Sequence, residues 1–187
     1  MRIISGSSKG KKILEPKDHN TRPLKDLTKE SIFNIINHSN KFKIILDNSN
    51  ILDLFSGVGS FGLECISRGS SYSTFVENYN NVLPVLKKNI SNLNYQDNST
   101  IIEKNIINDF NFRVFKKKFD IIFIDPPYKE KKLFSVLTRI IESNILNDNG
   151  IIIIHRHKKE KDEFPENFNI IEVKTYGVSK IIFGNYF

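Results

Sequence analysis

The chain has 187 residues, 28 of them basic and 21 acidic, which gives a net charge of +7. That length is typical of one domain, and the charge favours a polyanionic partner, although a solvated basic surface explains it equally well. A single cysteine, Cys65, excludes an internal disulfide, and no apolar run is long enough to span a membrane. The first residues also lack the apolar stretch of a signal peptide. We therefore expect a soluble, cytoplasmic monomer without a membrane partner.

Residues 1–40 form a predicted N-terminal extension. Short runs at residues 2–5 and 11–14 flank a turn bounded by Gly6 and Gly10, which predicts a basic β-hairpin. A polar loop with two prolines follows it. The next stretch, residues 25–37, predicts a helix because its apolar side chains recur at largely helical spacing. Those side chains are Leu27, Ile32, Phe33, Ile35 and Ile36.

Short apolar runs alternate with helix-length stretches from residue 51 onward. The runs predict buried strands at residues 51–55, 73–76, 100–102, 119–124 and 151–154. This alternation implies right-handed crossovers and an α/β fold with a doubly wound, mainly parallel sheet.

The last two runs, residues 169–174 and 180–186, have no helix between them and predict an antiparallel hairpin at the sheet edge. No linker is long enough to divide the chain. We therefore expect a single domain over residues 1–187, with the sheet in residues 41–187.

A glycine-rich loop follows the first strand of the predicted sheet. The strand runs into Ser56-Gly57-Val58-Gly59-Ser60-Phe61-Gly62, which matches G-x-G-x-x-G, and Glu77 lies 77 − 57 = 20 residues beyond Gly57. This spacing is typical of an NAD site. Asp53, however, precedes the loop, where a carboxylate would repel a pyrophosphate and attract a cationic amino-acid group. The charges favour S-adenosylmethionine, whereas Glu77 could bind the ribose of either cofactor.

The tetrapeptide Asp125-Pro126-Pro127-Tyr128 follows the apolar strand 119–124. The two prolines lack the N–H that a sheet ladder needs, so the strand ends there. In a doubly wound sheet the strand after the third adjoins the first, which places Asp125 beside the Gly57 loop. Simple termination of a strand is the alternative interpretation, and the nearby glycine loop makes it the weaker one.

The residue types in this tetrapeptide suit methylation of an exocyclic base amine. The lone pair of such an amine is delocalised into the ring, so the amine is a poor nucleophile. A carboxylate at Asp125 and a rigid carbonyl at Pro126 can accept its two protons and direct the lone pair at a methyl group. Tyr128 offers a ring on which an extruded base can stack, worth about 1–3 kcal/mol. The reaction needs no metal.

The chain resembles the RsmD family of bacterial 16S rRNA (guanine-N2)-methyltransferases over essentially its whole length. Besides the glycine loop and the tetrapeptide, the resemblance is carried by the N-terminal segments Arg2-Ile3-Ile4-Ser5-Gly6, Lys9-Gly10-Lys11-Lys12, Thr21-Arg22-Pro23, Lys29-Glu30 and Phe33-Asn34. It implies a class I methyltransferase fold, a seven-stranded sheet with an antiparallel edge strand. It also implies transfer of a methyl group from S-adenosylmethionine to N2 of a guanine in 16S rRNA, namely guanine 966, within a small-subunit assembly particle.

The resemblance also assigns site residues. The methionine part of the cofactor would lie against Asp53, Phe55, Gly57 and Gly59, the ribose against Glu77, and the adenine between Asn105 and Ile106. The target guanine would lie against Asp125, Pro126, Pro127 and Tyr128. The RNA would contact Arg2, Lys9, Lys11, Lys12 and Arg22.

Three positions depart from the family pattern. Lys29 stands where the family usually has arginine, and Asn105 stands where many class I enzymes have aspartate. The segment His155-Arg156-His157 follows the strand 151–154, where the family often carries an acidic residue. We expect His155, Arg156 and His157 to be basic surface residues and assign the histidines no role.

Other functions remain open at the level of sequence. A DNA adenine-N6 methyltransferase shares the tetrapeptide chemistry, but such enzymes generally carry a separate target-recognition region. The span from Glu77 to Asp125 predicts helix, strand and helix, which leaves little room for one. An NAD oxidoreductase and a non-enzymatic RNA-binding protein are weaker alternatives, based on the glycine loop and on charge alone.

Overall fold

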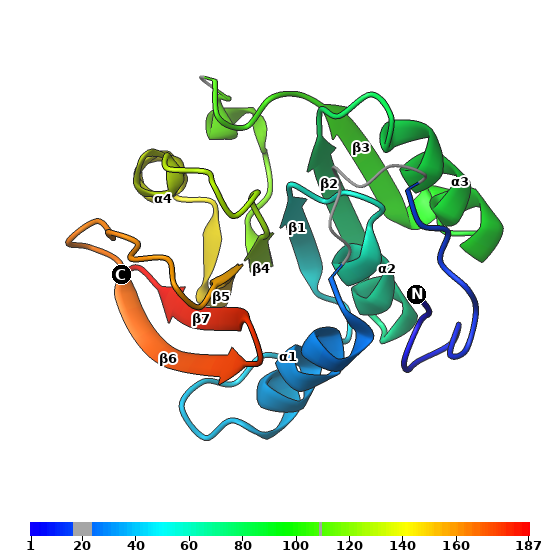
Figure 1. Cartoon of the computed structure of the whole chain (residues 1–187), viewed down its shortest axis with the longest axis horizontal. Helices are drawn as coiled ribbons and strands as arrows, with labels where there is room; N and C mark the ends of the chain where they lie inside the picture. Colours follow the sequence, from blue (N-terminus) through cyan, green and yellow to red (C-terminus); the bar gives the residue numbers. More distant parts are fainter. Residues whose placement is uncertain (17–23, 109) are drawn as a thin grey trace.

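The computed structural model of the chain describes residues 1–16, 24–108 and 110–187 (Figure 1). In chain order its elements are α1 (Asp26–His38), β1 (Asn50–Leu54), α2 (Ser60–Ser67), β2 (Tyr72–Glu77), α3 (Leu83–Leu93), η1 (Gln96–Asn98), β3 (Ser99–Glu103), η2 (Phe112–Val114), β4 (Phe119–Ile124), α4 (Leu133–Ser143), β5 (Leu146–His157), β6 (Asn169–Tyr176) and β7 (Ser179–Asn185). Among the described residues no helix is long and apolar enough to cross a membrane.

The seven strands form one sheet in the order β3-β2-β1-β4-β5-β7-β6. Strands β1 to β5 pair in parallel, whereas β7 pairs antiparallel with both β5 and β6. The predicted fold class is therefore confirmed. The reversed strand β7 lies one position in from the edge, because Ile181, Ile182 and Phe183 are buried there while most of β6 is exposed or half-buried.

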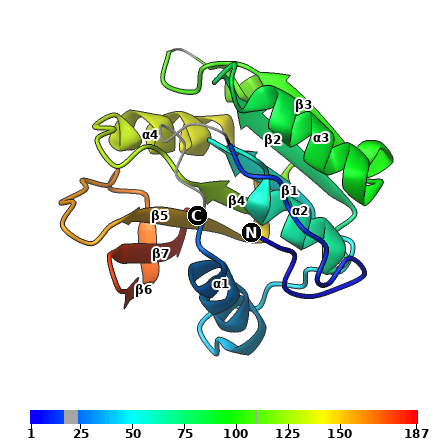
Figure 2. The ribbon, with the colours of Figure 1, turned by 45° about the vertical axis from the view of Figure 1, so that its right-hand side comes forward.

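Helices cover both faces of the sheet, since alternate residues of each strand point to opposite sides. Figure 2 shows α4 on the opposite side of the sheet from α1. On the α4 side, Ile152 and Ile154 pack in one core cluster with Leu137. On the other side, Ile151 and Ile153 pack with α1 and α2. Burial on both faces explains why these strands are continuous apolar runs.

The two N-terminal arms pair over fewer residues than the predicted hairpin. Among the described residues the two arms share one isolated antiparallel bridge, Arg2 with Lys12, with backbone hydrogen bonds from Ile3 N to the Lys11 carbonyl and from Ile13 N to the Met1 carbonyl on either side of it. The turn between the arms bonds to the end of α2 instead, because Ser7 N donates to the Ser67 carbonyl at 2.7 Å and Ser8 N to the Ser67 hydroxyl at 3.0 Å. These backbone groups are therefore unavailable for a longer ladder. The hairpin prediction is right in topology and wrong in extent.

A buried ion pair joins this extension to α2. The Lys29 ammonium donates to the Arg2 carbonyl at 2.8 Å and lies 3.4 Å from a Glu64 carboxylate oxygen. Glu64 in turn accepts from the backbone N–H groups of Ile4 and Ser5, at 2.8 and 3.0 Å. Both charged side chains are fully buried, and burial lowers the pKa of Lys29. Lys29 therefore has a structural partner set within the protein.

The segment between β3 and β4 differs from the prediction of a second helix. Its described residues hold only η2, a three-residue 3-10 turn. Phe110 and Phe112 are buried in the core beneath α4, and Arg139 of α4 donates to the carbonyls of Ile106 and Phe110. Tertiary packing of the aromatic side chains thus replaces helical hydrogen bonds here. The predicted helix is wrong, although the segment remains packed against the domain.

Candidate active site

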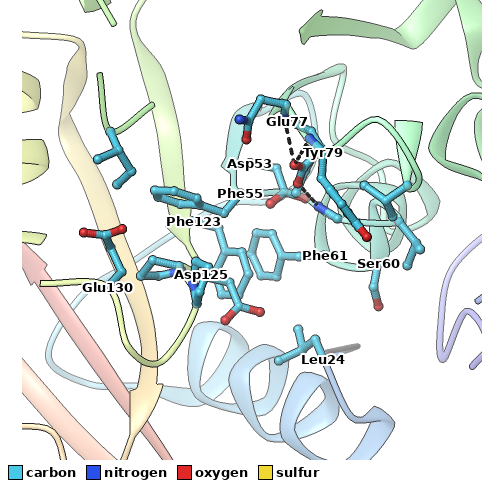
Figure 3. Close-up of a pocket in the computed structure, with 18 of the residues that line it drawn as sticks. Leu24, Asp53, Phe55, Ser60, Phe61, Glu77, Tyr79, Phe123, Asp125 and Glu130 are labelled. Atoms are coloured by element: carbon cyan, nitrogen blue, oxygen red, sulfur yellow. Dashed lines mark hydrogen bonds between the residues drawn. The ribbon is translucent and has the colours of Figure 1, made fainter. Parts of the chain in front are cut away.

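A cavity of about 540 Å³ opens at the carboxyl ends of β1, β2 and β4. Figure 3 shows the side chains of Asp53, Glu77 and Asp125 around it, together with Phe55. Ligands of open α/β sheets bind at this edge, where the strand order reverses. The structure therefore brings together the glycine loop and the tetrapeptide, which are far apart in the sequence.

The glycine loop makes its turn through left-handed backbone conformations. Phe55, Gly57 and Gly59 have φ values of 59°, 54° and 83°. A Cβ at Gly59 would lie 2.5 Å from a Leu86 methyl carbon. Both the positive φ and this close approach therefore favour glycine at position 59. Gly57 and Phe55 line the cavity. Gly59 is not among the residues that line it and precedes α2 as its N-cap residue.

Glu77 is held rigidly at the end of β2. One of its carboxylate oxygens accepts from Gly57 N at 2.8 Å, and the other from Asn78 N at 2.8 Å and Tyr79 N at 2.9 Å. An ionised carboxylate has about four acceptor positions, so these three N–H groups, counted among the described residues, leave capacity for a ligand hydroxyl. The ribose role assigned to Glu77 stays a prediction that this geometry supports.

Asp53 brings a carboxyl group to the floor of the cavity. It is 1% exposed and accepts from Gly62 N at 3.0 Å. Burial raises the pKa of Asp53 well above its usual range, and the charges of Asp125 and Glu77 raise it further. Four carboxyl groups, those of Asp53, Glu77, Asp125 and Glu130, therefore line one cavity, and a cationic ligand would relieve their mutual repulsion.

This charge arrangement decides between the two cofactors. S-adenosylmethionine carries a sulfonium and an ammonium group, both of which are attracted by carboxylates. A dinucleotide would bring two negative phosphates to the same loop, beside the buried Asp53. The residues present therefore fit the methyl donor and oppose NAD.

The tetrapeptide begins where β4 leaves the sheet. Asp125 N still donates to the Leu54 carbonyl at 3.3 Å, continuing the contact between β1 and β4, and the prolines end the ladder. Asp125, Pro126, Pro127 and Tyr128 all line the cavity. Their catalytic assignment stays a prediction.

The expectation that His155-Arg156-His157 is a surface segment is wrong. His155 is 3% exposed and Arg156 is 1% exposed. The reason is that β5 runs three residues past the apolar stretch, since β7 pairs with it through the partners His155–Ile181 and His157–Ser179. The apolar pattern of the sequence did not indicate that β5 extends to pair with β7.

Both buried side chains contact the tetrapeptide region. His155 Nδ1 lies 2.9 Å from a carboxylate oxygen of Asp125. Arg156 donates to the Pro127 carbonyl at 3.2 Å and the Glu130 carbonyl at 2.9 Å, and its Nε donates to Asp162 at 2.7 Å. The sequence interpretation therefore missed two residues next to the candidate site.

The loop after β3 contributes a different isoleucine from the one assigned. Asn105 lines the cavity, and its side chain accepts from Ile107 N at 2.8 Å. Ile107 lines the cavity, whereas Ile106 is 2% exposed and belongs to the core. By position Ile107 is the better candidate for contact with the adenine. Tyr79, two residues beyond Glu77, is a further lining residue that the sequence interpretation missed.

The predicted RNA-contacting residues lie on the surface of the N-terminal extension. Arg2, Lys9, Lys11 and Lys12 are all exposed. Arg22 lies outside the described residues. Leu24, just before α1, lines the cavity, so the extension reaches the candidate site. A role in RNA binding remains a prediction for these basic side chains.

Comparison with known proteins places the chain in a family. The family model described as "Conserved hypothetical protein 95" matches residues 1–185. The chain is 34% identical to Ribosomal RNA small subunit methyltransferase D of Buchnera aphidicola over 92% of this chain and 86% of that protein. It is 33% identical to YlbH of Bacillus subtilis over 97% and 96% of the two chains.

A solved structure extends the comparison to three dimensions. The Escherichia coli protein yhhF has 25% sequence identity and a TM-score of 0.82, covering 100% of this chain and 97% of its own. The family match spans nearly the whole chain, so it includes the glycine loop, the tetrapeptide and the extension alike. The chain belongs to the Conserved hypothetical protein 95 family, the RsmD family of methyltransferases.

Proposed function

We propose that the protein transfers a methyl group from S-adenosylmethionine to the N2 amine of a guanine in 16S rRNA. The tetrapeptide that lines this carboxyl-rich cavity carries this proposal. The names of relatives, such as Ribosomal RNA small subunit methyltransferase D, support ribosomal RNA as the substrate. Guanine 966 is the nucleotide that the family resemblance implies. The setting would be a small-subunit assembly particle in the cytoplasm, with the enzyme as a monomer.

The cofactor part of the cavity would work by charge and by shape. S-adenosylmethionine supplies an activated methyl group together with its own leaving group. Asp53 and the Gly57 loop face the space for its amino-acid part, and Glu77 can accept ribose hydroxyls. Asn105 and Ile107 border the space left for the adenine.

The tetrapeptide would orient the target amine. The Asp125 carboxylate and the Pro126 carbonyl can each accept an N–H of the amine, which turns its lone pair out of the plane of the base. The nitrogen later loses one proton, and Asp125 is the group placed to accept it. Tyr128 would stack on the base, because an amine inside a helix cannot reach the cavity and the nucleotide has to be extruded.

The test is methylation of small ribosomal subunits that lack the modification, with labelled S-adenosylmethionine. We expect one labelled guanine, located by nuclease digestion and mass spectrometry. Asp125→Ala should reduce the rate by about 10²- to 10⁴-fold, the usual contribution of a positioned proton acceptor, and reduce cofactor affinity much less, since Asp53 and Glu77 remain.

Three outcomes would contradict the proposal. Stronger labelling of duplex DNA than of subunits would favour adenine-N6 methylation, which uses the same tetrapeptide chemistry. Binding of NAD with no binding of S-adenosylhomocysteine would point to an oxidoreductase. Full activity of Asp125→Ala would remove the catalytic assignment.

A further inference from the structure

Three side chains, one directly after β4 and the others in β5 and β7, form a hydrogen-bonded chain that ends in the cavity. His155 of β5 lies between Asp125 and Ser179 of β7, with Nδ1 2.9 Å from Asp125 Oδ1 and Nε2 2.9 Å from Ser179 Oγ. His155 is 3% exposed and Ser179 is 6% exposed. Of the three, only Asp125 lines the cavity. His155 therefore acts on a ligand only through residues that line the cavity, of which Asp125 is its hydrogen-bond partner.

The chemistry of the partners determines which ring nitrogen carries the proton. An ionised carboxylate accepts hydrogen bonds and cannot donate them, so Nδ1 of His155 must be the donor to Asp125. Nε2 then accepts from the Ser179 hydroxyl when the ring is neutral. Second partners of this kind fix both the tautomer and the orientation of a histidine.

We propose that His155 is a positioning residue for methyl transfer. Its Nδ1–H holds Oδ1 of Asp125 and so fixes the orientation of the carboxylate for the target amine. As the nitrogen–carbon bond forms and the carbon–sulfur bond breaks, the nitrogen loses one proton to the Asp125 carboxylate, which later releases that proton to solvent. His155 keeps its Nδ1 proton throughout. The proposal rests on the proposed function for the identity of the reaction.

The packing around the ring supports this role. The Tyr128 ring meets His155 edge to face, with centroids 6.0 Å apart. The imidazole therefore contacts both side chains of the tetrapeptide that would touch the base. Arg156, the next residue of β5, holds the main chain of the same loop through the Pro127 and Glu130 carbonyls. His155 thus contacts the side chains of the tetrapeptide, and the next residue, Arg156, holds the backbone of the loop.

Two amide substitutions separate positioning from packing. In His155→Asn the amide nitrogen stands near the place of Nδ1 and can donate to Asp125. In His155→Gln the amide stands near the place of Nε2 and reaches towards Ser179, so the donor to Asp125 is lost. Both replacements are neutral, polar and able to hydrogen-bond.

We expect His155→Gln to lower kcat by about 10- to 100-fold, the usual effect of losing a hydrogen bond to a charged group. His155→Asn should recover most of that loss. The KM for the RNA substrate and the affinity for S-adenosylhomocysteine should stay near wild-type values in both variants. Ser179→Ala should lower kcat less than His155→Gln, because it removes only the outer partner. Thermal unfolding of each variant shows whether it folds.

Equal losses of kcat in the Asn and Gln variants would mean that the ring only fills space, and unchanged kcat in His155→Gln would also overturn the proposal. Wild-type protein that methylates no RNA would instead refute the proposed function. In that case a second measurement still tests the role of His155. ¹⁵N NMR of the histidine rings in the wild-type protein reports the tautomer without substrate. We expect the His155 proton on Nδ1 and a changed signal in Asp125→Ala. A ring protonated on Nε2 alone would overturn the proposal.

Discussion

Asp53 shows at the scale of one residue how ligand binding and stability oppose each other. Its carboxyl group is buried at the end of β1, and burial raises its pKa well above the ordinary value of 3.8. The folded protein therefore keeps a proton at pH values where the unfolded chain has lost it. The free energy of unfolding falls as the pH rises from the ordinary pKa through the raised pKa. A cationic cofactor would offset this cost when it binds.

We expect Asp53→Asn to stabilise the ligand-free protein at neutral pH. The amide cannot ionise but can still accept from Gly62 N, so the Tm should rise by about 2–4 °C for each kcal/mol of relieved burial cost. The gain should shrink towards pH 3.8, where the Asp53 carboxyl is protonated in the fold. The variant should also bind S-adenosylhomocysteine about 10- to 100-fold more weakly, since a hydrogen-bonding partner for a charged group is lost. Calorimetric titration and thermal unfolding measure both effects, and a lower Tm at neutral pH would contradict this account.

Strand β5 shows at the scale of one element how the end of an internal strand supports the candidate site. Arg156 is 1% exposed, and its guanidinium is shared between the Asp162 carboxylate and two loop carbonyls. A planar group with five donors can reach all three partners at once, which a lysine ammonium cannot do in the same geometry. Arg156 therefore links the loop after β4 to β5, at a point where β4 itself no longer forms sheet hydrogen bonds.

Arg156→Met should destabilise the protein by about 3 kcal/mol, because the Asp162 carboxylate, whose side chain is 5% exposed, loses a charged partner and the Pro127 and Glu130 carbonyls each lose one donor. Lys180, 3.1 Å from Asp162, limits the loss. Urea unfolding measures the change. The double variant Arg156→Met with Asp162→Asn should recover part of it, because the uncompensated carboxylate is gone. A double variant less stable than the single one would contradict the charge explanation.

At the scale of the whole molecule, the described residues form three core clusters that cross element boundaries. Ile3 and Ile13 of the extension pack in one cluster with Leu63 of α2 and Leu86 of α3. The hydroxyl of Tyr95, after α3, also donates to Ser8 Oγ at 2.7 Å. The extension therefore completes the core beside α2 and α3 and shares its burial with the sheet.

We expect residues 1–187 to unfold in one cooperative transition. Far-UV circular dichroism and tyrosine fluorescence should give the same midpoint, because the extension has no core of its own. The chain has six tyrosines and no tryptophan, so tyrosine fluorescence reports on positions that include Tyr95. An earlier fluorescence transition would show that the extension separates from the sheet and would contradict the prediction.

Local patterns predicted most of the fold. Strand β4 begins and ends as its apolar run and the prolines indicated, and α1 is displaced by one residue from its expected bounds. Both depend on interactions within a few residues, namely helical spacing and the missing N–H of proline. The segment after β3 was predicted wrongly because its aromatic residues pack beneath α4, which no local periodicity reports.

The candidate site, too, could be predicted from the sequence only in part. The sequence by itself determined the fold class, the glycine loop and the tetrapeptide, because in a doubly wound sheet the ends of the first and fourth strands meet wherever the helices lie. Only the tertiary structure decided that His155 and Arg156 are buried behind the tetrapeptide, that Ile107 and not Ile106 lines the cavity, and that Lys29 is paired with Glu64. Each of these depends on contacts between residues distant in the sequence. Such contacts set burial and charge pairing, and they leave no periodic trace along the chain.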